Sequence, residues 1–233
     1  MARTSSTGEC LLCGERKGKV AMTRHVEACL SEERGAGGRK RAAAPAATRA
    51  LHLVIDCPHA PVFWLHVSVP LDATLGDLDA FLRDTWLECC GHLSGFEIGG
   101  TRFESDPEDQ FRHLEGMDVP VGRVLVPGIT FSHEYDYGTT TVLRLKVVSE
   151  HLGGRPTRSR RNVTLLARND PPKPVCAVCG APATRVCAQC AYGGDPWVCD
   201  DCAPEHECGE EALLPFVNSP RCGVCGYTGG LGG

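Results

Sequence analysis

The sequence predicts an α+β protein in which a small domain, made of a sheet and one helix, is flanked by two cysteine-rich modules. Three observations lead to this fold class. Strand-like alternation and one capped helical segment fill the middle of the 233-residue chain, twelve of the 15 cysteines lie near its two ends, and the charge changes sign between these parts. The length suits one domain of ~100 residues with small modules attached.

The predicted segments differ in net charge, which is +5 over residues 1–50, −10 over 51–152, +5 over 153–175 and −5 over 176–233. Together with composition, these sign changes place the boundaries. We predict a small module at 1–34, a flexible basic linker at 35–50, the sheet-plus-helix domain at 51–172 and a cysteine-rich module at 173–233.

The same composition indicates the compartment. No apolar run approaches the ~18 residues that a membrane helix needs, so we expect no membrane partner. The N-terminal segment MARTSSTGEC is polar and lacks the apolar region of a secretory signal, so we expect a cytoplasmic protein. Because the cytosol keeps thiols reduced, clustered cysteines there predict metal ligands rather than disulfides.

The first module has the ligand spacing of a single zinc finger. Cys10 and Cys13 are followed by His25 and Cys29 in a C-x2-C-x11-H-x3-C pattern. Two cysteines on a tight turn supply half of a tetrahedron, and two residues four apart on a helix supply the other half. A segment this short cannot bury enough apolar area to fold alone, so this first zinc ion is expected to be structural.

Basic residues on and after the finger suggest one type of partner. They are Lys17, Lys19, Arg24, Arg39, Lys40 and Arg41. Such a set can hold phosphates, but one finger reads only ~3 base pairs, so any contact with nucleic acid is expected to be weak and largely independent of sequence. The alternatives are a solvated basic face and a finger that binds protein.

The middle of the chain predicts the order strand, strand, helix. Residues 51–57 and 63–69 alternate between apolar and polar side chains, which predicts a β-hairpin with one buried face. Thr74 and Asp77 form a predicted capping box for an amphipathic helix that extends to about Leu87. Further strands are expected at 95–103, 130–137, 141–149 and 163–166. This outline fits a β-grasp-like sheet with its helix on one face.

Several local motifs resemble one known family. They are PVFW at 61–64, TLGDL at 74–78, HL at 92–93 with FEIGG at 96–100, VL at 124–125 with PG at 127–128, and YDYG at 135–138. This pattern is similar to the plasmid pRiA4b open-reading-frame-three-like family over residues 50–168. The resemblance implies a small α+β domain, often linked to plasmids and transposable elements, without an established activity. Segments at 165–172, 208–211, 218–221 and 225–227 resemble its zinc-bearing members. Members of this family usually continue the motif that corresponds to YDYG with an Asp and then a Trp. In this chain Thr139, Thr140 and Thr141 follow it instead.

Three sets of side chains are candidates for catalysis, and each has a stronger structural explanation. They are His52 with His66, the acidic run Asp106, Glu108 and Asp109, and the adjacent thiols Cys89 and Cys90. The histidines are expected to be exposed partners across the hairpin, the acids a solvated loop and the thiols core-filling or inert. No nucleophile–base pattern and no nucleotide-binding glycine loop is present. We therefore expect no catalytic residue and no small-molecule substrate.

The C-terminal module carries the strongest metal pattern of the chain. Three C-x2-C knuckles are followed by four more potential ligands, and the full set is Cys176, Cys179, Cys187, Cys190, Cys199, Cys202, His206, Cys208, Cys222 and Cys225. The first and third knuckles are 19 residues apart, within the usual range for one zinc site. We therefore assign Cys176, Cys179, Cys199 and Cys202 to a second zinc ion.

The third predicted zinc ion uses the middle knuckle in a cross-braced arrangement, which resembles B-box-like modules in its spacing. Cys187 and Cys190 are joined by His206, and Cys208 and Cys225 compete for the last position; Cys222 is the least favoured ligand. All three zinc ions would have four protein ligands, which predicts structural rather than catalytic metal.

Taken together, these features predict a non-enzymatic, zinc-stabilised binding or adaptor protein that contacts nucleic acid weakly through its basic N-terminal arm, residues 1–50. A protein–protein adaptor without nucleic-acid contact is the first alternative, and an uncharacterised metal-dependent enzyme is the second.

Overall fold

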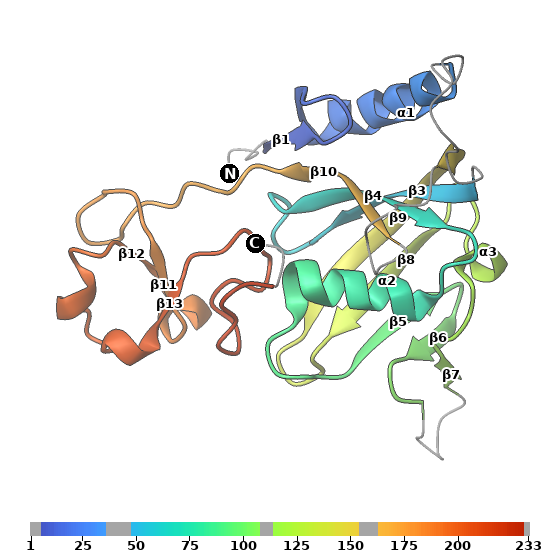
Figure 1. Cartoon of the computed structure of the whole chain (residues 1–233). Coiled ribbons are helices and arrows are strands. Elements are labelled where there is room, and N and C mark those ends of the chain that lie inside the picture. The colour runs from blue at the N-terminus through green and yellow to red at the C-terminus, as the bar shows by residue number, and fades with distance from the viewer. Residues whose placement is uncertain (1–5, 36–47, 108–113, 154–162, 231–233) are drawn as a thin grey trace, which may run out of the picture.

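The computed structural model describes residues 6–35, 48–107, 114–153 and 163–230, and shows a mixed α/β protein with one large sheet and few helices (Figure 1). The large sheet contains β1 (Thr7–Cys10), β2 (Arg16–Gly18), β3 (Thr48–Asp56), β4 (Trp64–Pro70), β5 (Ser94–Ile98), β6 (Thr101–Glu104), β7 (Glu115–Gly116), β8 (Thr130–Tyr135), β9 (Thr141–Gly153) and β10 (Thr164–Asn169). The helical segments are α1 (Lys19–Gly35), α2 (Leu75–Leu82), the short π-helix η2 (Arg83–Leu87), α3 (Val121–Val124), and the short 3-10 helices η3 (Cys190–Tyr192), η4 (Ala203–Glu205) and η5 (Glu210–Ala212).

The strand order of the large sheet is β2-β1-β10-β4-β3-β9-β8-β5-β6-β7. The predicted hairpin is present: β3 and β4 pair antiparallel with Leu53 opposite Val67. The expected strand over 95–103 is in fact two, β5 and β6. Gly99 and Gly100 separate them with positive φ angles of 57° and 84°, which glycine adopts without steric cost.

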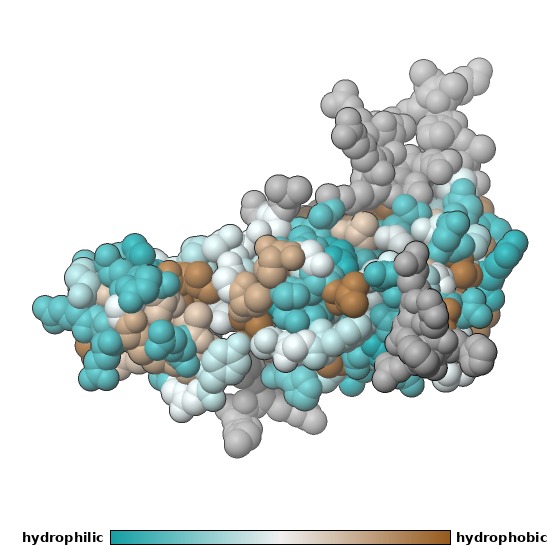
Figure 2. All heavy atoms as spheres, turned by 90° about the horizontal axis from the view of Figure 1, so that it is seen from below, coloured by the Kyte–Doolittle hydropathy of each residue, from teal (hydrophilic) through white to brown (hydrophobic). Residues whose placement is uncertain are grey.

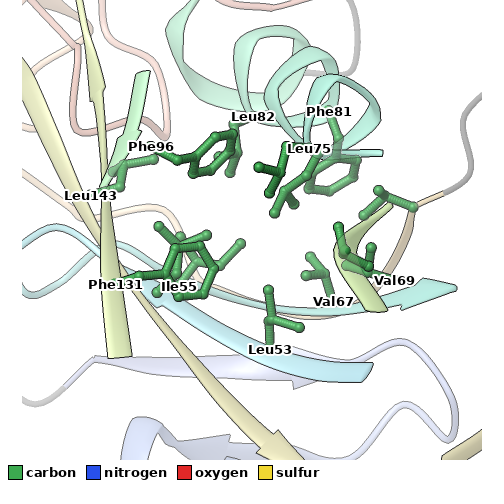
Figure 3. Packing of buried hydrophobic residues seen from close by; sticks show 14 of the residues in the cluster. Leu53, Ile55, Val67, Val69, Leu75, Phe81, Leu82, Phe96, Phe131 and Leu143 are labelled. Atoms are coloured by element: carbon green, nitrogen blue, oxygen red, sulfur yellow. The ribbon is translucent and has the colours of Figure 1, made fainter. Parts of the chain in front are cut away.

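Helix α2 begins where the sequence pattern predicted but ends at Leu82, and the π-helical segment η2 continues the chain to Leu87, the predicted end. Thr74 caps it, since its side chain accepts the Asp77 N–H while the Asp77 carboxylate accepts the Thr74 N–H. The apolar side of α2 packs on one face of the sheet, and Figure 3 shows its side chains converging with those of the strands. The labelled members are Leu53, Ile55, Val67, Val69, Leu75, Phe81, Leu82, Phe96, Phe131 and Leu143. This cluster is the main core.

The opposite face of the sheet is also covered, because the N-terminal module joins the sheet. Strand β1 pairs with β10 and with β2, and α1 lies on the side of the sheet away from α2 (Figure 1). A second core forms there, in which Trp64 is fully buried; its other members are Cys10, Met22, Val26, Leu30, Leu166 and Ala167. The module is thus part of the folded sheet. Of the predicted linker, 36–47 lies outside the described residues, while Thr48 to Ala50 already belong to β3.

This covering changes the prediction for the polar face of the hairpin. His52 and His66 were expected to be exposed, but both are 0% exposed, and His52 Nε2 lies 2.9 Å from His66 Nδ1. The hairpin is buried on both faces since the N-terminal module covers the face that the sequence alternation marked as polar.

The C-terminal module forms a second, three-stranded sheet in the order β12-β11-β13. Its strands are β11 (Arg185–Cys187), β12 (Trp197–Val198) and β13 (Leu213–Pro215). After β13 the chain returns to the main domain, where the Ser219 hydroxyl donates to the Trp86 carbonyl at 2.6 Å. In the described ranges of the chain, no helix combines the length and apolar character needed to cross a membrane.

Candidate metal centres

Four groups of cysteine and histidine side chains converge in the described part of the chain. Within each group the four donor atoms all lie within 4.8 Å of one another. The groups are Cys10, Cys13, His25 and Cys29; Cys176, Cys179, Cys199 and Cys202; Cys187, Cys190, His206 and Cys208; and Cys89, Cys90, His92 and Cys225. The first three are the ligand sets that the sequence spacing predicted, and each set can hold a metal ion.

The first group joins a strand, a turn and a helix. Cys10 ends β1, and Gly14 closes the turn after Cys13 by donating its N–H to the Cys10 carbonyl at 2.7 Å. From α1, His25 Nε2 lies 3.1 Å from Cys13 Sγ, and Cys29 Sγ lies 3.7 Å from Cys13 Sγ. A tetrahedral ion with metal–sulfur bonds of ~2.3 Å has sulfur–sulfur edges of ~3.8 Å, so this spacing suits zinc.

Without a metal ion, the crowded thiols of this group resist ionisation. Burial, and after it the neighbouring thiols of Cys13 and Cys10, raise the pKa of Cys29 to about 12. Several thiolates cannot be held side by side without positive charge, because like charges in one site repel. A divalent ion at the centre would supply that charge.

The second group pairs the first and third knuckles of the C-terminal module, as predicted. Cys179 Sγ lies 3.6 Å from Cys199 Sγ, again close to a tetrahedral edge. Backbone N–H groups face the first sulfur: chiefly the N–H of Cys179, then that of Cys199, lowers the pKa of Cys176 to about 6. A thiolate at neutral pH is the form that binds metal.

The third group alternates with the second along the chain, which is the ligand order of the predicted cross-brace. Cys190 Sγ lies 3.7 Å from both His206 Nε2 and Cys208 Sγ. Burial of Cys187 opposes ionisation, but the Cys190 N–H and the His206 ring outweigh it and lower the Cys187 pKa to about 7. Cys208 therefore occupies the position for which Cys225 was a competitor.

The fourth group was not predicted. The sequence reasoning treated Cys89 and Cys90 as core-filling or inert, yet Cys90 is exposed and its sulfur lies 3.0 Å from His92 Nε2 and 3.7 Å from Cys225 Sγ. The local pattern Cys-Cys-Gly-His was the available signal. Cys222 belongs to none of the four groups in the described residues; its half-buried sulfur accepts the Val217 N–H.

Of the other catalytic candidates, the two histidines are buried and the acidic run is described only in part. His52 and His66 are buried inside the sheet layers, and burial is the main cause that lowers their pKa values to about 4 and about 3. Asp106 is exposed, while Glu108 and Asp109 lie outside the described residues. The altered turn at 135–138 serves a structural contact: the Asp136 carboxylate accepts the N–H groups of Gly138 and Thr139 and pairs with the buried Arg221.

The basic residues of the arm differ in their surroundings. Lys17 pairs with Glu15 at 2.9 Å, and Lys19 pairs with Asp56 at 2.8 Å. Arg24 is exposed on α1, and Arg39, Lys40 and Arg41 lie outside the described residues. Two of the cations expected to meet phosphate are therefore already held by carboxylates.

Comparisons with known proteins give little beyond the geometry. No family model and no curated protein matches the chain. One similar solved structure is the crystal structure of a protein of unknown function from Methanosarcina mazei Go1, at 14% identity and a TM-score of 0.41. The match covers 51% of this chain and 67% of that one. So distant a similarity carries no argument about function, which rests on the site itself.

Proposed function

We propose that this protein is a zinc-stabilised binding or adaptor protein without enzymatic activity. In this proposal three structural zinc ions stabilise the two cysteine-rich modules, one ion in the N-terminal module and two in the C-terminal module. The observation that supports the proposal most is the convergence of three four-donor groups of thiols and imidazoles. Zinc prefers such ligands, and four of them fill its coordination sphere. A catalytic zinc would need an open position for water or substrate.

Native mass spectrometry of the purified full-length chain tests this proposal. We expect zinc at each of the three groups, and each of the variants Cys13→Ser, Cys179→Ser and Cys190→Ser should lose one ion. Cys199→Ser should lose the same ion as Cys179→Ser, so the double variant should lose one ion and not two. A stable folded protein that holds one zinc ion or none would overturn the proposal.

Nucleic acid is the first proposed partner, through the basic arm. Binding should be weak and steeply salt-dependent, since most of its energy would come from counterion release. Because β1 is a strand of the sheet, deleting the arm would damage the fold, so charge variants are the better test. At low salt, wild type should bind labelled DNA and RNA. A variant in which Arg24, Arg39, Lys40 and Arg41 are all changed to Ser should bind them at least tenfold more weakly. If wild type bound neither DNA nor RNA at low salt, nucleic acid would be excluded as a partner.

A protein partner is the second candidate, and a cleft favours it. A cavity of about 610 Å³ lies where the N-terminal module, β10 and the C-terminal residues meet. Leu11, 51% exposed, lines it beside Phe216 and Tyr227. On the face seen in Figure 2, hydrophobic residues form separate brown areas among hydrophilic ones, with no continuous apolar surface. A protein segment with an apolar side chain would suit the cleft.

The adaptor branch is tested by pull-down after nuclease treatment. Leu11→Asp should abolish capture of a partner, whereas Val126→Asp, an exposed apolar residue that does not line the cleft, should retain it. Equal capture by both variants, or loss of capture after nuclease treatment, would contradict a protein partner at this cleft.

The broader expectations remain part of the proposal. The β3–β4 hairpin followed by α2 on one face supports a β-grasp-like description of the domain at 51–172. The motifs that resemble the plasmid pRiA4b open-reading-frame-three-like family support an association with mobile elements. Reduced thiols at the metal groups suit a cytoplasmic location.

A further inference from the structure

We propose that Cys89, Cys90, His92 and Cys225 form a fourth metal site, which binds a thiophilic divalent cation such as zinc and fastens the C-terminal tail, residues 216–230, to the main domain. The site differs from the other three in the origin of its ligands. Three of them come from the loop between η2 and β5, and the fourth comes from the tail, 135 residues after Cys90. The ion would therefore be a cross-link between two distant parts of the chain.

The donor spacing resembles that of the first three groups. Cys90 Sγ lies 3.6 Å from Cys89 Sγ and 3.7 Å from Cys225 Sγ, close to the ~3.8 Å edge of a zinc–thiolate tetrahedron. His92 Nε2 lies 3.0 Å from Cys90 Sγ and 3.3 Å from Cys225 Sγ. The Cys13–His25 distance in the first group is 3.1 Å. Three thiols and one imidazole make a set that zinc prefers.

The backbone adopts uncommon conformations to present these donors. Gly91, between Cys90 and His92, has a φ of +77°, and its N–H donates to the Glu88 carboxylate. Cys225 has a φ of +49°, which side-chain-bearing residues rarely adopt. Such a conformation is held only where its surroundings determine it strongly. A bond from Cys225 Sγ to a metal ion would hold the backbone of Cys225 in this conformation.

Contacts beside the site already align the tail with the loop. The Arg221 side chain is 0% exposed, pairs with Asp136, and donates to the Thr141 hydroxyl at 3.0 Å. Another guanidinium nitrogen lies 3.5 Å from Cys89 Sγ. A donor of this kind stabilises a metal-bound thiolate and fixes its orientation. Arg221 thus places the tail, and the metal would close the connection at its exposed end.

A metal link across 135 residues would stabilise the protein as a disulfide does, by restricting the unfolded chain. It would also have a local effect. Without the ion, the tail should leave the loop more often, while β3, β4 and α2 keep their own core.

Native mass spectrometry of the full-length protein, purified with zinc, tests the site. We expect four zinc ions in wild type, three in Cys225→Ser and Cys90→Ser, and four in the matched control Cys222→Ala, whose sulfur lies outside every group. Cys225→His, which keeps a metal donor, should retain four.

Hydrogen exchange gives a second measurement that does not depend on counting ions. Amides of residues 216–230 should exchange at least tenfold faster in Cys225→Ser than in Cys222→Ala, with β3 and β4 unchanged. If wild type held only three zinc ions, and ligand variants of the other three groups each lost one of them, the fourth site would be overturned. The proposed function would still stand. The site would also be overturned if the rate at which Cys90 and Cys225 are alkylated were the same with zinc as without it.

Discussion

At the scale of single residues, His52 and His66 share a hydrogen bond inside the sheet, and His52 Nδ1 and His66 Nε2 have no hydrogen-bond partner within the described residues. Burial is the main cause that lowers their pKa values to about 4 and about 3, from about 6.5 in an unfolded chain. Both rings are therefore neutral in the folded protein at pH 5.5 and above, while the unfolded chain takes up protons below about pH 6.5.

This difference predicts that stability falls as the solution becomes more acidic. The contribution of the two rings is fully present above about pH 6.5 and is lost as the pH falls towards the folded values. Each histidine should lower the free energy of unfolding by about 1 kcal/mol between pH 7.5 and 5.5. Urea unfolding at each pH, with zinc occupancy checked, measures this. His52→Gln should flatten the slope, whereas the exposed His59→Gln should not; equal slopes would contradict the assignment.

Arg221 is the second residue whose role depends on burial. Removing its charge in Arg221→Met would leave the Asp136 carboxylate, 5% exposed, without its cation. The loss of one partner from such a pair costs on the order of 3–5 kcal/mol. Chemical denaturation should show this loss for Arg221→Met and almost none for Arg123→Met, whose side chain is exposed on α3. Equal stability of the two variants would disprove the structural role of the pair.

At the scale of elements, the position of β1 against β10 depends on a residue without a side chain. A Cβ atom at Gly8 would lie 2.1 Å from the Arg168 carbonyl oxygen and 2.5 Å from the Trp64 ring. Trp64 in turn donates its ring N–H to the Ser6 hydroxyl at 2.7 Å. The close approach of β1 therefore requires glycine and buries Trp64.

Gly8→Ala should consequently weaken the attachment of the N-terminal module. We expect the free energy of unfolding to fall by about 1–3 kcal/mol, the usual cost of forcing atoms into a packed core. The control is Gly18→Ala in β2, where a Cβ would meet nothing within 4 Å. Urea unfolding compares the two variants, and exchange of the β10 amides should rise only in Gly8→Ala. If Gly18→Ala were the more damaging change, the packing argument would be wrong.

At the scale of the whole molecule, the parts differ in what stabilises them. The main domain has an extensive apolar core under α2, whereas the buried core of the C-terminal module is small: Cys187, Val198, Ala203, Ala212 and Leu213. A module of this size cannot fold on so little apolar burial, so its metal ligands must supply the rest.

Removal of metal by a chelator should therefore unfold the molecule in parts. Amides of residues 176–215 should lose their protection from exchange, while those of β3, β4 and α2 remain protected, because the buried residues of their core include no member of the four metal groups. Hydrogen exchange before and after chelation measures this, and added zinc should restore the pattern. Simultaneous loss of protection throughout the chain would show that the domain depends on the metal as well.

The sequence by itself determined the local features. Capping residues and apolar periodicity located the hairpin and α2, because these signals act over a few neighbouring residues. The ligand spacing likewise indicated which cysteines and histidines gather in the first three groups, except the last ligand of the third, for which Cys208 and Cys225 competed; a knuckle and a helical turn fix the distances within each half of a site.

Only the tertiary structure decided what meets across long separations. His52 and His66 looked exposed until the N-terminal module was seen to cover their face, and Cys225 joined Cys89, Cys90 and His92 only once the tail had returned to the main domain. Alternation within a strand reports the polarity of each face but not what packs on it, and spacing along the chain says nothing about a ligand that arrives from 135 residues away. Those contacts depend on how the folded elements pack, and no local pattern encodes that packing.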